Sequence, residues 1–102
     1  MIIRHGDLLL IKTDAIPQGM EQHNGNSILE GEVSNHHHRI SKGTIFKTEP
    51  TIDNNYLLGY LDLESTGLLT HEEHKTIEVP AGKYILHVQR EYDPIEERRV
   101  RD

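Results

Sequence analysis

Histidine is the residue type most able to do chemistry in this chain, which has eight histidines among 102 residues. Most of them fall in two groups, the run His36-His37-His38 and the sequence His71-Glu72-Glu73-His74, and His87 follows further on. A neutral imidazole ring is the commonest protein ligand for transition metals, and its charge changes near physiological pH. The chain has no cysteine, which excludes disulfides and thiolate metal sites. These groups predict either a polar site or a titrating surface.

The spacing of the first group suits a metal site on a β-strand. Side chains alternate across a strand, so His36 and His38 would share one face while His37 and Arg39 occupy the other. Two imidazoles on one face can bind a single ion from a rigid scaffold. Zinc, iron, manganese and nickel all accept imidazole nitrogen, so the pair does not identify the metal. A polar loop that happens to be rich in histidine is the competing interpretation.

The second group is expected in a connection between two strands. His71 and His74 would be neighbours on a helix, but no helical period surrounds them. Their spacing also differs from the His-Glu-x-x-His pattern of metalloprotease helices. Glu72 is a candidate general base or a partner for a metal-binding histidine. The alternative is a solvated turn whose charges only aid solubility.

The residues 83–92 form the clearest predicted strand. One face would carry Tyr84, Leu86, Val88, Arg90 and Tyr92, and the other Ile85, His87, Gln89 and Glu91. The second face is polar at successive positions. It therefore predicts either a solvated face or a polar cavity in which Glu91 is a further candidate base.

The leading hypothesis is one His/carboxylate site that binds a divalent transition metal, with action on a small molecule by metal-assisted chemistry as its extension. The candidate metal ligands are His36, His38, His71, His74 and His87, with Glu73 as a substitute. His5 and His23 are assigned to the surface, and Gly6-Asp7 to a turn that begins a strand.

The alternative hypothesis is a non-catalytic module that binds a small ligand or a protein partner without metal. Arg39, Arg90 and Tyr92 would then be the anchors, because arginine offers a fork of donors and tyrosine offers a stacking face. A third possibility is a structural protein whose histidines titrate at its surface.

The elements that must position these residues are short strands. Turn residues recur roughly every ten residues, and no segment keeps a helical period for long. Strands are expected over 8–13, 27–33, 44–48, 56–63, 75–79 and 83–92, with a bend or bulge at Gly59. One or two helical turns are expected within 95–101. The pattern predicts a single all-β domain over 1–102, folded as a small antiparallel barrel or sandwich.

Composition narrows the classes of function. Hydrophobic residues are 34% of the chain and aromatic residues 5%, so the core should be thin and aliphatic. The net charge of −6 comes from 17 acidic residues against 11 Lys and Arg, which disfavours non-specific nucleic-acid binding. No apolar run approaches the ~20 residues that span a bilayer, and no signal-peptide pattern is present. We expect a cytoplasmic protein that makes no membrane contact.

Two resemblances accompany these patterns. His36-x-His38 after Gly31, with Pro80-x-Gly82 before His87, resembles fragments of the two cupin motifs. Cupins are small β-barrels that bind a metal through a His-x-His pair, a glutamate and a later histidine. The resemblance implies a metal held by the histidine pair and His87. Here the spacing from the glycine to the pair is shorter, and no glutamate closely follows the pair.

The chain as a whole resembles a set of small, uncharacterised bacterial and phage proteins. The residues that carry this resemblance are Gly6-Asp7-Leu8-Leu9, Gly31-Glu32-Val33 with His36-x-His38, His71-Glu72-Glu73-His74 with Pro80-x-Gly82-x-Tyr84, and Gln89-Arg90-Glu91-Tyr92 with Pro94. It implies one intact domain of nearly the full length and carries no function with it.

Overall fold

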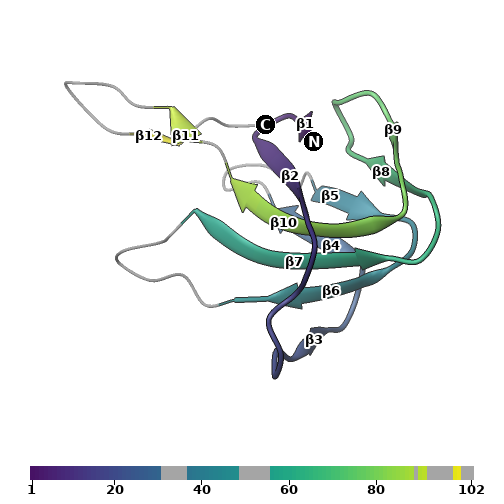
Figure 1. The fold of residues 1–102 in the computed structure, drawn as a ribbon. Helices are drawn as coiled ribbons and strands as arrows, with labels where there is room; N and C mark the ends of the chain where they lie inside the picture. The colour runs from purple at the N-terminus through teal and green to yellow at the C-terminus, as the bar shows by residue number, and fades with distance from the viewer. Residues whose placement is uncertain (31–36, 49–55, 89, 92–97, 100–102) are drawn as a thin grey trace.

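The described part of the chain folds into two main antiparallel β-sheets in a sandwich-like structure, with a further two-stranded sheet (Figure 1). In this computed structural model the described residues are 1–30, 37–48, 56–88, 90–91 and 98–99. The larger sheet contains, in order across it, β1 (Ile2–His5), β2 (Leu8–Thr13), β10 (Gly82–Val88), β7 (Leu57–Leu63), β6 (Thr44–Lys47) and β3 (Gln22–His23). The smaller sheet contains β4 (Ser27–Glu30), β5 (His37–Ile40), β8 (Gly67–Thr70) and β9 (Ile77–Val79).

The prediction of an all-β fold is confirmed, and of the two predicted architectures the sandwich is the one observed. The described strands do not close into a barrel, because β1 and β3 lie at opposite edges of the larger sheet. The prediction of helical turns within 95–101 is wrong for Arg98–Arg99. These two residues form β12, which pairs with β11 (Arg90–Glu91), while the rest of that segment lies outside the described residues.

Alternation along the strands places the core between the sheets. Tyr84, Leu86 and Val88 of β10 are buried, as the predicted face requires, and Tyr84 and Leu86 share one core cluster with Leu8 and Leu10 of the neighbouring β2. The smaller sheet contributes Ile28, Ile40, Leu69 and Val79. The core is aliphatic apart from Tyr84, so burial of branched side chains, about 1.5–3 kcal/mol each, is its main source of stability.

The bulge expected near Gly59 is present. The register between β10 and β7 shifts between Leu86 and His87, opposite Gly59 and Leu57. Gly59 has a φ of 148°, and a Cβ at this position would overlap the carbonyl oxygen of Phe46 in β6. Glycine is therefore required where the backbones of β6 and β7 approach each other.

A tight hairpin joins β1 to β2 at one end of the sandwich. His5 pairs with Leu8, so Gly6 and Asp7 form a two-residue turn. Gly6 has a φ of 62°, which glycine adopts without strain at the first turn position of such hairpins. In the part of the chain that the structure describes, no helix is long and apolar enough to cross a membrane.

Candidate functional site

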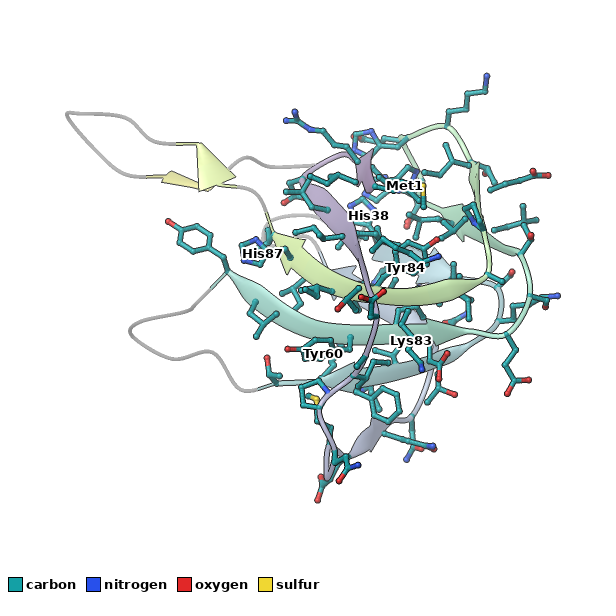
Figure 2. All side chains as sticks on the ribbon, in the orientation of Figure 1. Met1, His38, Tyr60, Lys83, Tyr84 and His87 are labelled. Carbon is teal, nitrogen blue, oxygen red and sulfur yellow. The ribbon has the colours of Figure 1, made fainter. Side chains whose placement is uncertain are left out.

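Four histidine rings and one carboxylate gather where the β1–β2 turn meets the connection from β8 to β9. This histidine cluster consists of His5, Asp7, His38, His71 and His74. The centres of the four rings lie 4.4 to 6.3 Å apart. His38 is 1% exposed, His5 4%, Asp7 5% and His71 9%, while His74 is half-buried. Figure 2 labels His38 at this end of the fold. Polar side chains buried to this degree need specific partners.

The two sheets each contribute to the cluster. In the smaller sheet, β5 and β8 pair Arg39 with Thr70 and Ile40 with Leu69. One step further along the same register, His38 lies opposite His71, and their ring centres are 4.4 Å apart. The chain then turns, and the ring of His74 comes to 4.4 Å from that of His71. The larger sheet supplies His5 from the end of β1, with Asp7 in the turn that follows.

The backbone partner of His5 fixes which of its ring nitrogens carries hydrogen. His5 Nε2 lies 2.8 Å from the carbonyl oxygen of Lys75, which can only accept, so this nitrogen donates. His38 Nε2 lies 3.5 Å from Asp7 Oδ1, which is an ion-pair distance rather than a hydrogen bond. The Nδ1 atoms of the two rings lie 3.0 Å apart. Because His5 carries its hydrogen on Nε2, its Nδ1 is the acceptor in this contact, and Nδ1 of a neutral His38 is the donor.

The backbone also fixes the hydrogen of the His71 ring, in the same tautomer as that of His5. Its Nδ1 accepts a hydrogen bond from the backbone N–H of Glu73 at 3.0 Å. A neutral ring that accepts at Nδ1 carries its hydrogen on Nε2, and this Nε2 atom is fully buried. His71 therefore presents an N–H, rather than a lone pair, on its buried side.

Glu72 ties the connection that carries His71 and His74 to the outer side of β5. Its carboxylate accepts the backbone N–H of His37 at 2.8 and 3.1 Å and lies 3.5 Å from Arg39 Nη1. The hydrogen bond from His37 is the main cause that holds the pKa of Glu72 below its ordinary value, with Arg39 adding to it. A carboxylate with a lowered pKa is a poor general base at neutral pH. Its contacts fit the role of a partner that positions neighbouring histidines.

The predicted alternation within the first group is confirmed where it can be followed. His38 points into the fold, and His37 lies on the other face of β5, where its Nδ1 is 3.3 Å from Ser27 Oγ. His36 lies outside the described residues.

The structure places His87 apart from the cluster. Its ring stacks against that of Tyr56 at 6.1 Å, on the far part of β10 from the position of His38 in Figure 2. The side chains of Arg90 and Glu91 in β11, and the whole of Gln89 and Tyr92, lie outside the described residues. Two of the residues that would line the predicted polar cavity beside His87, Gln89 and the side chain of Glu91, therefore lie outside the described part of the chain.

Two members of the cluster were not identified from the sequence. The assignment of His5 to the surface is wrong, because it is 4% exposed. Asp7 was assigned to a turn, which is confirmed, yet its carboxylate is buried against His38. The signal that could have found them is the Gly6-Asp7 turn itself. A two-residue hairpin pairs His5 with Leu8 at the start of an apolar run, and so directs His5 toward the core.

The rings converge more closely than their donor atoms do. Among the described residues, no group of three or more His, Asp or Glu side chains is already arranged to hold a metal ion. The rings that gather here are instead engaged with one another, with Asp7 and with the backbone. Occupation by a metal would therefore require local rotation of at least one ring.

A second polar feature lies on the turns that follow β5 and β7. It is a surface hollow of about 300 Å³ lined by Lys42, Gly43, Thr44, Asp62, Glu64 and Ser65. None of the residues singled out from the sequence lines this hollow.

Comparison with known proteins places the chain in a family without assigning it an activity. No match was found among curated proteins or among solved structures. A family model described as a domain of unknown function, DUF8820, matches residues 4–89. That range contains every member of the histidine cluster and both sheets except the first two residues of β1. The chain therefore belongs to the DUF8820 family.

Proposed function

We propose that the histidine cluster binds one divalent transition-metal ion. The ligands are His5 through Nδ1, His38 through Nδ1, and the ring of His74. Asp7 and the carbonyl of Lys75 act as outer partners that hold the first two rings in the required state. The observation that carries this proposal is the pair of Nδ1 atoms 3.0 Å apart, on two buried rings of a group of four histidines.

A metal ion that bonds both nitrogens would displace the hydrogen between them, and His38 would then carry its hydrogen on Nε2, 3.5 Å from Asp7 Oδ1. Metal-binding histidines usually donate their other N–H to a carboxylate or a backbone carbonyl, and His38 and His5 have one partner of each kind.

The distances in the cluster are compatible with this role. Two nitrogens bound to one tetrahedral ion at about 2.0–2.1 Å lie about 3.3 Å from each other. The His5 and His38 Nδ1 atoms need to separate only slightly from their 3.0 Å contact. The ring centre of His74 is 5.6 Å from that of His5 and 5.9 Å from that of His38. Rings bound to one ion have centres roughly 5–5.5 Å apart, so His74 is near enough to be the third ligand.

The donor set restricts the class of metal. Imidazole nitrogen suits zinc, copper, nickel, cobalt and iron, whereas calcium and magnesium prefer oxygen ligands. Without thiolates the set does not favour the softest ions. Zinc is the simplest test ion because it has no redox chemistry and no geometric preference of its own. Cytoplasmic location and action on a small molecule stay predictions from the sequence.

Metal titration of the tag-free protein tests the proposal. We expect one zinc ion per chain by calorimetry, and a loss of tight binding in His5→Ala and His38→Ala. His87→Ala is the matched control, because its ring stacks on Tyr56 outside the cluster, and it should bind zinc as the unmodified protein does. Equal binding by all variants, or substoichiometric metal across zinc, cobalt and nickel, would overturn the proposal.

A further inference from the structure

We infer that the protein forms a symmetric dimer in which the β1 strands of two copies pair antiparallel and join their larger sheets into one. The inference does not rest on the proposed metal site. β1 is the outermost strand of the larger sheet, beside the N-terminus (Figure 1). It pairs with β2 on one side, and none of the other described strands pairs with it on the opposite side.

Two residues of β1 direct their backbone hydrogen-bonding groups away from the sheet. The amide of Lys12 donates to the carbonyl of Met1 at 2.9 Å, which continues the register of β1 with β2. Bonded and non-bonded pairs alternate in an antiparallel ladder, so Ile3 bonds β2 while Ile2 and Arg4 do not. The N–H and C=O groups of Ile2 and Arg4 therefore form an open edge to which a second strand can bond.

The other edges of the two main sheets carry features that oppose such pairing. β3 contains only two residues, β9 contains three and is followed by Pro80, and the register of β4 shifts between Ser27 and Leu29. Short strands, proline and bulges are common means by which proteins keep sheet edges from associating. β1 has an unbroken register, and its first residue Ile2 is 65% exposed, beside Met1 at 63%. β1 is thus the edge best suited to receive a strand.

Symmetry and charge select a second copy of this chain as the partner and fix the register. Because Ile2 and Arg4 are the outward-bonding residues, a two-fold axis can pass through Ile2, Ile3 or Arg4. An axis at Arg4 sets two arginines directly opposite each other, which is unfavourable. An axis at Ile2 bonds only that residue to its counterpart. An axis at Ile3 pairs Ile2 of each copy with Arg4 of the other, and each pair exchanges both of its N–H···O bonds.

The side chains are compatible with the register centred on Ile3. Ile3 is partly buried against the core cluster, so its two copies meet across the axis on the inner side of the joined sheet. Ile2 lies on the outer face, in a cross-strand row that continues through Ile11 and Ile85. The methylene stem of Arg4 from the second copy would cover the exposed Ile2 while its guanidinium stays in water. The pairing therefore buries the apolar surface that this edge exposes.

Sedimentation velocity of the untagged protein in the presence of a chelator is the first test. The range is about 10 μM to about 1 mM, because a contact of one short strand fits a weak dimer. We expect the mass to rise from the 11.8 kDa of one chain toward twice that value. The matched variants Ile2→Glu and Ile2→Lys both remove the apolar side chain and differ in the sign of the charge. Beside Arg4 of the second copy, Ile2→Lys should dimerise about tenfold more weakly than Ile2→Glu.

Hydrogen exchange of backbone amides reports the edge directly. The Arg4 N–H should exchange more slowly as the dimer forms, whereas the Ile3 N–H is bonded to β2 at every concentration. Arg4→Pro removes the outward donor without breaking a hydrogen bond to β2, and it should stay monomeric. Arg4→Ala is its control, because this variant keeps the N–H and should still dimerise.

The outcomes decide between this edge and other surfaces. A chain that stays monomeric up to about 1 mM overturns the inference and leaves the edge to a strand of another protein. A dimer that is equally strong in Ile2→Glu and Ile2→Lys, or that persists in Arg4→Pro, uses another register or surface and also overturns it. If circular dichroism shows that Arg4→Pro does not fold, the two Ile2 variants and the Arg4 amide still decide.

Discussion

Replacing Asp7 by alanine should weaken metal binding and also destabilise the metal-free protein. Asp7 Oδ1 lies 3.5 Å from His38 Nε2, and the side chains are 6% and 1% exposed. Water cannot easily take the place of the carboxylate at that depth. In Asp7→Ala the buried ring of His38 therefore loses the carboxylate beside it, and we expect a cost of about 1–3 kcal/mol, the range for removing the partner of a buried polar group. If His38 is protonated, the loss of its counter-charge adds to this cost.

The effect on metal affinity follows from the same contact. Removing the partner that orients a metal-binding histidine typically lowers affinity about 10–100-fold. Asp7→Asn provides the matched comparison, because the amide keeps an oxygen acceptor but no charge, and it should lie between alanine and the unmodified protein. Asp14→Ala is the surface control, since Asp14 is exposed in the segment that follows β2.

Two independent assays test this prediction. Urea unfolding of the metal-free proteins gives the change in the free energy of unfolding, and zinc calorimetry gives the change in affinity. If Asp7→Ala unfolds at the same urea concentration as Asp14→Ala and binds zinc equally well, the carboxylate does not support His38. The role of Asp7 as a partner of His38 would then be refuted.

Three further predictions concern the elements around the site. The pKa of Glu72 is lowered in the folded state, so its contribution to stability is present above the unfolded value of 4.5 and is lost as pH falls through the lower folded value. Stability of Glu72→Gln measured by denaturation should therefore fall less than that of the unmodified protein as pH drops from about 6 to 3; parallel curves would contradict this. Gly59→Ala should lower the free energy of unfolding by about 3 kcal/mol or more in a urea titration, because both its positive φ and the Phe46 carbonyl oppose a Cβ, and a change below about 1 kcal/mol would contradict the bulge geometry. Tyr84→Phe should cost about 1 kcal/mol, since the buried hydroxyl donates to the Pro80 carbonyl at 2.7 Å, and an unchanged thermal midpoint would show that this bond contributes nothing.

Much of the fold follows from patterns that are local in the sequence. The alternation that places Tyr84, Leu86 and Val88 on one face is a property of any extended strand, so it could be predicted without knowing what that face contacts. The same rule correctly separates His38 from His37. The bulge at Gly59 also has a local signal, because glycine within a strand marks a close backbone approach.

The boundaries of the strands were less predictable. The strand expected over 83–92 ends at Val88, and Arg90–Glu91 pair instead with Arg98–Arg99 in a separate ladder. The residues of that ladder are polar and give no hydrophobic period that would distinguish continuation of a strand from the start of a new one.

The short antiparallel strands could be predicted from the sequence, as could the candidacy of His38, His71 and His74 for one site. The packing of the two sheets adds His5 and Asp7 to this group and places His87 elsewhere. The physical reason is that strand parity fixes which face a side chain takes within its own sheet. It does not fix which residues of a second sheet lie opposite, because that depends on how the two sheets pack.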